Sequence, residues 1–132
     1  MIKYMLDTGT CIYTIKHRPT ALREAFRRHH GQLCISTVTF MELIKGVEKS
    51  ANPAANMEVI EGFVARLDVL DFDRNAAAHS GQVIASLKLG DLKIGAYDSQ
   101  IAGHARSQGL IVVTNNIREF SRVPGLQIEN WI

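Results

Sequence analysis

The chain has 132 residues, of which 46% are hydrophobic and 21% are charged, and its formal net charge is +2. This composition is close to that of folded globular proteins and excludes a disordered or fibrous chain, and no apolar run approaches the roughly 20 residues of a membrane-spanning helix. The two cysteines, Cys11 and Cys34, are too few for a disulfide framework or a zinc site. Because the first residues also lack a signal-peptide pattern, we expect a soluble, cytoplasmic protein with one domain over residues 1–132.

Short apolar segments alternate along the chain with segments of helical pattern. The expected strands are 4–6, 33–36, 69–72, 110–113 and a last edge strand over 127–131. The expected helices are 10–16, 21–30, 40–49, 56–67, a helix that Asp73 or Asn75 caps and that runs to about Leu87, and 98–108. Thr39 is a candidate N-cap with Glu42 three residues later, the spacing of a capping box. Strands that alternate with helices predict βαβ units, a parallel sheet and an α/β fold class.

Acidic residues lie where several of these elements meet. Asp7 follows the first strand, Glu42 lies in the helix after the second strand, Asp98 opens the helix before the fourth strand, and Glu119 follows that strand. In parallel α/β sheets ligands bind beyond the carboxyl ends of the strands, so these side chains can reach one edge. Grouped carboxylates repel one another unless a cation neutralises them. Oxygen ligands select Mg²⁺ or Mn²⁺ over zinc, and such sites hydrolyse phosphodiesters.

Each of these residues also has a simpler role when it is taken alone. Asp7 and Asp98 are typical helix caps, Glu42 completes a capping box, Glu119 is typical of an exposed helix, and residues 114–116 are typical of a turn. The five histidines show no metal-like pairing and are interpreted as surface or packing residues. It is the shared edge that favours a metal site over these separate roles.

Positive charge is concentrated between Lys16 and His30, a stretch with five lysines and arginines and a single acid, Glu24. Such a stretch is either a solvated helix face or a surface for a polyanion. Charge alone leaves both interpretations open.

Four ordered segments carry a resemblance to a known family. They are Met-Leu-Asp-Thr at 5–8, Ile-Ser-Thr-Val-Thr-Phe-Met-Glu-Leu at 35–43, Tyr-Asp at 97–98 with Ile-Ala-Gly-His-Ala at 101–105, and Leu-Ile-Val-Val-Thr-Asn-Asn at 110–116 with Arg-Glu-Phe at 118–120. With them the chain resembles the PIN-domain ribonucleases, and most of all the VapC toxins of bacterial toxin–antitoxin pairs. The resemblance covers essentially the whole chain. It implies a three-layer PIN-like domain, a central parallel sheet flanked by helices, that hydrolyses RNA with Mg²⁺ or Mn²⁺.

The resemblance also implies partners and a substrate. Toxins of this kind usually form homodimers and are held inactive by a VapB-type antitoxin, through which a larger toxin–antitoxin assembly can sit on operator DNA. Many relatives cut structured RNA such as tRNA, and the enteric ones attack initiator tRNA. We therefore expect an RNA substrate, an antitoxin partner and no membrane partner.

Carried over residue by residue, the resemblance assigns Asp7, Glu42 and Asp98 to the family's acidic triad. Asp7 and Asp98 are expected as direct metal ligands, and Glu42 as a ligand either directly or through water. Asn116 stands where many relatives have a fourth acid, and Glu119 is expected to substitute for it from one helical turn away.

A second departure from the family pattern is Gly9, where many relatives have an asparagine that can orient the first aspartate. No ligand is lost with it. Around the triad we expect Thr8, Ser99 and Thr114 to contact the phosphate or the ligands. The residues expected to hold the RNA backbone by charge are Arg23, Arg27, Arg28, Arg118 and Arg122. Because water rather than the ribose 2′-hydroxyl is the expected nucleophile, the products should carry 5′-phosphate and 3′-hydroxyl ends.

Two functions of other classes remain open from the sequence. A phospho-receiver module also has an acidic, Mg²⁺-binding strand end, but it needs an acidic pair where Asp7 stands alone and a lysine after Val113. A catalytically silent interaction protein with the PIN fold is kept open by Gly9 and Asn116. A cleavage assay with and without a chelator separates this alternative from an enzyme.

Overall fold

In the computed structural model, which describes residues 1–132, five strands form one sheet in the order β3-β2-β1-β4-β5. The strands are β1 (Tyr4–Leu6), β2 (Leu33–Ser36), β3 (Asp68–Leu70), β4 (Ile111–Val113) and β5 (Ile128–Glu129). All neighbouring strands are parallel, and Met5 in the central strand pairs with Cys34 on one side and with Val112 on the other. The predicted parallel sheet, with a short last strand at its edge, is confirmed.

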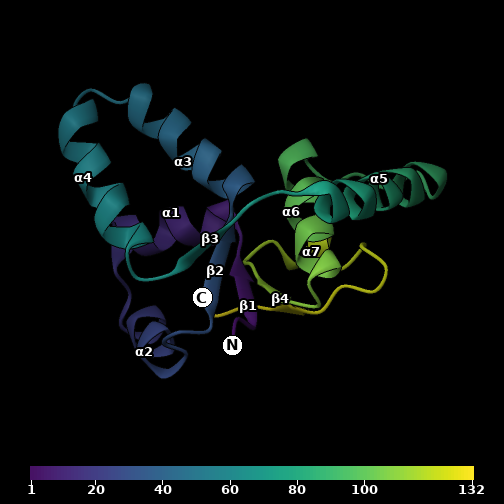
Figure 1. Cartoon of the computed structure of the whole chain (residues 1–132), viewed down its shortest axis with the longest axis horizontal. Coiled ribbons are helices and arrows are strands. Elements are labelled where there is room, and N and C mark those ends of the chain that lie inside the picture. Colours follow the sequence, from purple (N-terminus) through teal and green to yellow (C-terminus); the bar gives the residue numbers. More distant parts are fainter.

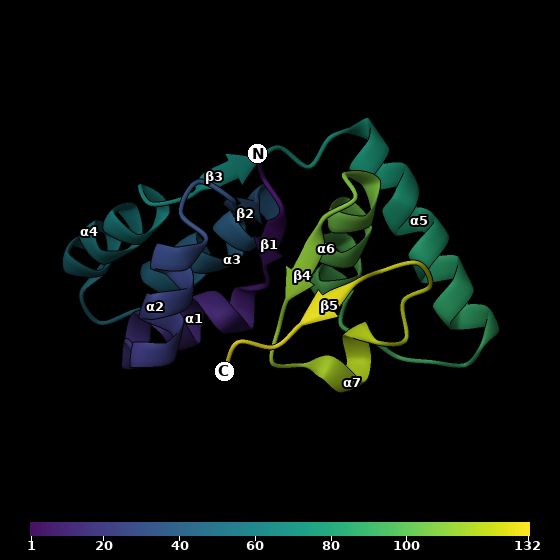
Figure 2. The ribbon, with the colours of Figure 1, turned by 90° about the horizontal axis from the view of Figure 1, so that it is seen from below.

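Seven helices connect and cover the strands. They are α1 (Thr8–His17), α2 (Thr20–Arg28), α3 (Thr37–Glu48), α4 (Pro53–Val64), α5 (Arg74–Leu89), α6 (Ala96–Ser107) and α7 (Ile117–Phe120). Helices α1 to α4 lie on one side of the sheet and α5 to α7 on the other (Figures 1 and 2). The predicted three-layer α/β architecture is therefore confirmed. None of the helices is both long and apolar enough to cross a membrane.

Two apolar clusters fill the spaces between the layers. Tyr4 and Leu6 of β1 point into the cluster under α1, α3 and α4, whereas Met5 between them points into the cluster under α5 and α6. All three side chains are buried. A strand buried on both faces needs apolar residues at successive positions, which explains why the strand segments read as continuous apolar runs.

The start of α3 differs from the sequence prediction. Ser36 is the N-cap, because its Oγ accepts a hydrogen bond of 3.0 Å from the N–H of Val38 and the helix begins at Thr37. Thr39 lies inside the first turn and is completely buried, so the predicted capping box of Thr39 and Glu42 is wrong. Ser36 still has the extended backbone of the strand that it ends, which is the conformation that an N-cap needs.

Helices α1 and α6, which carry or adjoin predicted site residues, also begin two residues earlier than predicted. Asp7 is the N-cap of α1, and its Oδ1 accepts a hydrogen bond of 2.8 Å from the N–H of Thr10. Helix α6 begins at Ala96 with Gly95 at its N-cap, so Asp98 lies within its first turn rather than capping it. The prediction that Asp73 caps α5 is confirmed by a 2.9 Å hydrogen bond from the N–H of Ala76.

Candidate active site

Four carboxylates come together at the edge of the sheet where the strands end. Asp7 directly follows β1, Glu42 extends from the second turn of α3, Asp98 from the first turn of α6, and Glu119 from α7. Parallel strands that are followed by helices bring the starts of those helices to one edge, so this convergence follows from the topology.

Asp7 is held on both oxygens. Its Oδ1 accepts the Thr10 N–H, and its Oδ2 accepts a 2.6 Å hydrogen bond from the hydroxyl of Thr114, which follows β4. The side chain is buried. Each carboxylate oxygen has a second lone pair. Asp7 can therefore still bind a cation while these hydrogen bonds fix its orientation.

Glu42 is oriented by two threonines. The hydroxyl of Thr8 donates a 2.6 Å hydrogen bond to Oε1 of Glu42, and the hydroxyls of Thr8 and Thr39 are 3.2 Å apart. A threonine has only one hydroxyl proton, and Thr8 gives its proton to the carboxylate, so Thr39 must be the donor between the two threonines. This chain of hydroxyls fixes Glu42 against α1.

Burial is the largest cause that raises the pKa of Asp98, from 3.8 to about 6, and the charges of Asp7, Glu42 and Glu119 raise it further. Like charges that lie near one another disfavour ionisation of each. Every cause acting on Asp98 raises its pKa, so no cation of the protein offsets the effect of burial and of the other acids on this carboxyl. Glu119 in turn accepts a hydrogen bond from the side-chain amide of Asn116.

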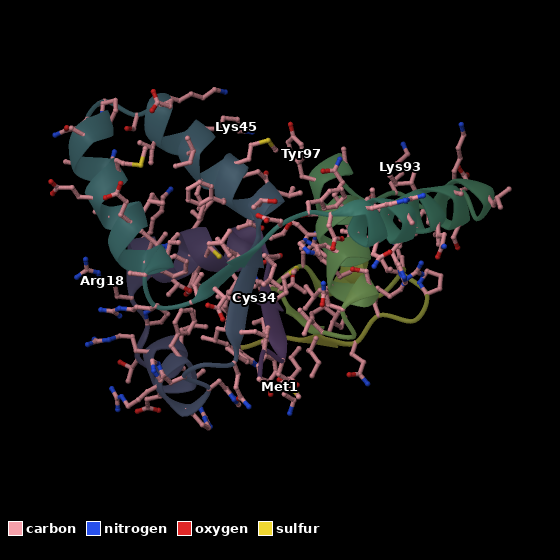
Figure 3. The ribbon with its side chains drawn as sticks, viewed as in Figure 1. Met1, Arg18, Cys34, Lys45, Lys93 and Tyr97 are labelled. Atoms are coloured by element: carbon pink, nitrogen blue, oxygen red, sulfur yellow. The ribbon has the colours of Figure 1, made fainter.

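Two contacts join α3 and α6, the helices that carry Glu42 and Asp98. Lys45 and Tyr97, labelled in Figure 3, form a cation–π pair with the Lys45 ammonium 5.6 Å from the ring centroid. The second contact is made by His104 of α6, which is completely buried. Its Nδ1 lies 2.8 Å from the hydroxyl of Ser36, the N-cap of α3. Burial lowers the pKa of His104 although Asp73 and Asp71 raise it. This histidine is a core residue, as the sequence interpretation expected.

The donor set fits a hydrated divalent cation. No three acidic, histidine or cysteine side chains converge closely enough to hold one ion between them. Mg²⁺, however, keeps several of its waters and binds through one or two carboxylates. The oxygen-only donors and the unbalanced charge around Asp98 match that requirement.

The structure separates some of the other predicted site residues from the carboxylates. The Ser99 hydroxyl donates to the carbonyl of Gly95 at 3.1 Å within its own helix, and Ser99 lines a different pocket, next to Leu87 of α5 and Lys93. Arg122 is also used elsewhere, because its side chain donates a hydrogen bond to the carbonyl of Lys93. Arg118, in contrast, is exposed on α7, one residue from Glu119.

The C-terminal end of the basic helix α2 lies near the start of the central strand β1. Arg23, Arg27 and Arg28 are all exposed on α2. His29, the C-cap of α2, packs on Tyr4, the first residue of β1, with ring centroids 4.7 Å apart, and β2 begins four residues later, whereas the carboxylates follow the ends at which the strands finish. These arginines therefore do not line the carboxylate cluster.

A pocket of about 350 Å³ opens next to Asp7 and includes residues that the sequence analysis did not single out. Its lining residues are Asp7, Gly9, Tyr13, Asn115, Asn116 and Ile132. Tyr13 follows Gly9 by four residues, a spacing that places both on one face of α1. That spacing was the available signal for Tyr13. Ile132 reaches the pocket only because β5 pairs with β4, and no local pattern indicates it.

Comparison with known proteins places this chain and its fold in a family. Residues 4–126 match the PIN domain. The chain belongs to the PIN-domain family. Among PIN-domain proteins, the tRNA(fMet)-specific endonucleases VapC of Salmonella typhimurium and Shigella flexneri are 55% and 57% identical to it, over 99% of both chains in each case. Ribonuclease VapC2 of Haemophilus influenzae is 48% identical over the full length of both chains.

Solved structures of PIN-domain proteins agree with this assignment. The DNA-bound VapBC structure from Salmonella typhimurium contains a chain that superposes on this one with a TM-score of 0.98 at 55% identity. The structure of VapBC2 from Rickettsia felis bound to a promoter DNA fragment contains a chain that superposes with a TM-score of 0.95 at 35% identity. Both cover all of this chain and of the matched chain. The resemblance to VapC ribonucleases is confirmed, the chain is a PIN-domain ribonuclease of the VapC type, and the phospho-receiver alternative is excluded.

Proposed function

We propose that this PIN-domain ribonuclease is the toxin of a type II toxin–antitoxin pair, and that it uses Mg²⁺ or Mn²⁺ to cut tRNA, initiator tRNA included. The observation that carries the proposal is the grouping of Asp7, Glu42, Asp98 and Glu119, in which the other three acids raise the pKa of Asp98. The choice of substrate is supported by the two relatives named tRNA(fMet)-specific endonucleases.

In this proposal Asp7 and Asp98 hold the cation directly, Glu42 holds it through water because no three acidic side chains converge on one ion, and Glu119 with Asn116 positions water. A bound divalent cation supplies an activated water and neutralises charge on the scissile phosphate. Attack by water on the phosphorus, with the 3′-oxygen as the leaving group that takes up a proton, would leave a 5′-phosphate and a 3′-hydroxyl.

Thr8 and Thr114 serve the carboxylates rather than the phosphate. Each has a single hydroxyl proton, and each donates it to a carboxylate oxygen, Glu42 Oε1 for Thr8 and Asp7 Oδ2 for Thr114. Hydrogen bonds from surrounding residues fix the orientation of metal ligands and raise metal affinity. The hydroxyl of Ser99 is used within α6 and has no part in this arrangement.

Two separated groups of arginines hold the RNA. Arg118 lies one residue from Glu119, so it can contact the phosphates next to the cut. Arg23, Arg27 and Arg28 are exposed on α2, whose C-terminal end packs beside the start of β1, and we expect only a large RNA to reach them while its backbone occupies the carboxylate edge. A structured substrate such as tRNA is large enough to contact both groups, whereas a short oligonucleotide at the carboxylates contacts Arg118 alone.

The proposed partner is a VapB-type antitoxin that keeps a homodimer of this chain inactive in the cytoplasm. The structures from Salmonella typhimurium and Rickettsia felis are of VapBC bound to DNA, and their matched chains superpose on this one along its full length. By this similarity we propose that the toxin joins a larger assembly on operator DNA through the antitoxin. Residues 1–132 form one domain in this account.

Expression in bacteria tests the proposal. Induction of this chain alone should stop growth and leave cleaved initiator tRNA, and co-expression with its antitoxin should restore growth. Asp7→Ala removes a proposed ligand and should be tolerated. The control Asp91→Asn changes an exposed aspartate in the loop before α6, where asparagine tolerates the left-handed backbone (φ 54°), and should remain toxic. Equal growth of cells carrying the wild-type protein and Asp7→Ala would contradict the toxin proposal.

A further inference from the structure

The pocket beside Asp7 has an unusual lining for a phosphodiesterase. Apart from Asp7 itself, its side chains carry no charge: the lining consists of Gly9, Tyr13, two asparagines and Ile132. The lining therefore offers a phosphate group no charge-assisted hydrogen bond from a lysine or arginine. Its volume of about 350 Å³ lies within the usual range of ligand pockets, about 300–1,000 Å³.

The two asparagines keep hydrogen-bonding atoms for a ligand. Asn116 donates from its NH₂ group to Glu119, and a carboxylate only accepts, which leaves the Asn116 amide oxygen as an acceptor. The amide oxygen of Asn115 is 3.4 Å from the Asn130 NH₂ group, which leaves the NH₂ group of Asn115 as a donor. A donor and an acceptor on adjacent residues match the hydrogen-bonding edge of a nucleobase.

Tyr13 and Gly9 supply the remaining features. The Tyr13 ring is half-buried, and its centroid is 4.6 Å from that of His17, so the ring is supported from within α1. Aromatic rings of this kind stack on unpaired bases. A Cβ added at Gly9 would lie 3.9 Å from both carboxylate oxygens of Asp7, so the glycine keeps the space beside the carboxylate open.

We infer that this pocket binds the unstacked base of a nucleotide next to the scissile phosphate, and that Tyr13 and Asn115 select which base is accepted. The inference rests on the proposed function, because it places an RNA phosphate at Asp7. It also gives a shared role to Gly9 and Asn116, the two positions at which the sequence departs from the common family pattern, since both line this pocket.

A set of RNA substrates that differ only at the nucleotide beside the cut tests the inference. The set contains the four bases and an abasic nucleotide, and kcat and KM are measured separately. The wild-type protein should discriminate among the bases. Tyr13→Ala should raise KM about tenfold for substrates with a base, the order expected when one base has no ring to stack on, and change little for the abasic substrate. Tyr13→Phe keeps the ring and should retain the wild-type KM.

Asn115→Ala should reduce discrimination among the four bases. Two matched controls change exposed residues that do not line the pocket: Ile12→Ala, the neighbour of Tyr13 on α1, and Asn75→Ala on α5. Both should retain the wild-type KM and base preference. Melting temperatures of all variants establish that they are folded.

Binding of the same RNAs to the Asp98→Asn protein separates this inference from the proposed function. If the wild-type protein cuts no RNA while Asp98→Asn binds with a base preference that Tyr13→Ala abolishes, the cleavage proposal fails and the pocket inference holds. If RNA is cut but Tyr13→Ala slows all substrates equally, the abasic one included, or Asn115→Ala leaves discrimination unchanged, the pocket inference is wrong.

Discussion

Thr114, which follows β4, donates a 2.6 Å hydrogen bond to Oδ2 of Asp7, which follows β1. The backbone N–H of Asp7 also donates to the carbonyl of Val113 at 3.0 Å, so the two strand ends are joined twice. Thr114 Oγ1 in addition accepts the N–H of Asn116 at 2.8 Å. The register of the sheet, and not a loop, therefore sets where Asp7 points.

Thr114→Val tests this arrangement, because it keeps the shape of the side chain and removes the donor to Asp7. We expect kcat/KM for RNA cleavage to fall about 10- to 100-fold, the usual effect of removing a residue that orients a metal ligand. Thr114→Ser keeps the hydroxyl and should restore most of the activity.

The control for this change is Thr14→Val. Thr14 is a buried threonine of α1 whose hydroxyl donates to the carbonyl of Thr10 and does not contact a carboxylate. The Thr14→Val protein should keep the wild-type cleavage activity. If Thr114→Val and Thr14→Val cleave RNA equally well, the hydrogen bond to Asp7 has no role in positioning.

Asp98 gives a pH dependence that can be measured without RNA. Its pKa is raised from 3.8 to about 6 by folding, so the folded protein binds this proton more tightly than the unfolded chain does. The stabilisation from the protonated group is fully present below pH 3.8 and is lost as the pH rises through about 6. With a chelator at pH 8, Asp98→Asn should therefore unfold with a free energy about 1–3 kcal/mol larger than that of the wild-type protein.

Urea denaturation of both proteins between pH 4 and pH 8 checks this prediction. The difference should nearly vanish at pH 4, and excess Mg²⁺ at pH 8 should stabilise the wild-type protein more than the variant. Asp91→Asn serves as control and should show neither effect, since Asp91 is exposed, and asparagine tolerates its left-handed backbone (φ 54°). An equal gain from Mg²⁺ in both proteins would show that Asp98 is not a ligand.

Much of this site could be predicted from the sequence because it depends on the ends of strands. The run before Asp7 is apolar at every position, as both faces of β1 are buried, and a parallel sheet brings its strand ends to one edge. Local sequence rules for helix capping failed at α3, where two residues were candidates for the N-cap. Ser36 and Thr39 are both good N-caps, and only the length of β2 decides for Ser36.

Residues that meet only through tertiary structure could not be predicted. Ile132 lines the pocket beside Asp7 only because β5 returns beside β4, and it has no local signal of function. Tyr13 had only its four-residue spacing from Gly9 on α1 as a signal. The position of α2 in the fold could not be predicted from the sequence either. Its charge left a polyanion surface and a solvated face equally open, and no local pattern indicated that its C-cap, His29, packs on Tyr4 at the start of β1.

Gly103 is required for the packing of α6 against α5. A Cβ at this position would lie 2.3 Å from Oγ and 2.5 Å from Cα of Ser80, and the backbone of α5 cannot move aside alone. We expect Gly103→Ala to lower the free energy of unfolding by about 2–3 kcal/mol or more, as overpacking does. Gly62→Ala on α4 is the control, because nothing lies within 4 Å of its added Cβ. It should stabilise the protein by about 0.5–1 kcal/mol, and the proposed close approach is wrong if both changes have the same sign.

The arginines of α2 should affect only large RNA. With Asp98→Asn as the background, so that RNA is bound and not cut, the triple change of Arg23, Arg27 and Arg28 to Ala should weaken binding of tRNA. It should also reduce the log–log salt slope by about 0.7–0.9 for each phosphate that the variant no longer neutralises. Binding of a short oligonucleotide should change little, whereas Arg118→Ala should weaken binding of both RNAs.

Arg66→Ala changes an exposed arginine after α4 and is the control for these measurements. If the triple variant binds tRNA with the affinity and salt slope of the Arg66→Ala protein, the basic face of α2 is only a solvated helix surface.

Cleavage of purified initiator tRNA, measured with a chelator and with added Mg²⁺ or Mn²⁺, tests the central claim most directly. The wild-type protein and the control Asp91→Asn should cut only when the metal is present and leave 5′-phosphate and 3′-hydroxyl ends, and Asp98→Asn should show no detectable cleavage under either condition. Cleavage that survives the chelator, wild-type rates in Asp98→Asn, or a wild-type protein that cuts no RNA with metal present would contradict a metal-dependent ribonuclease centre at these carboxylates.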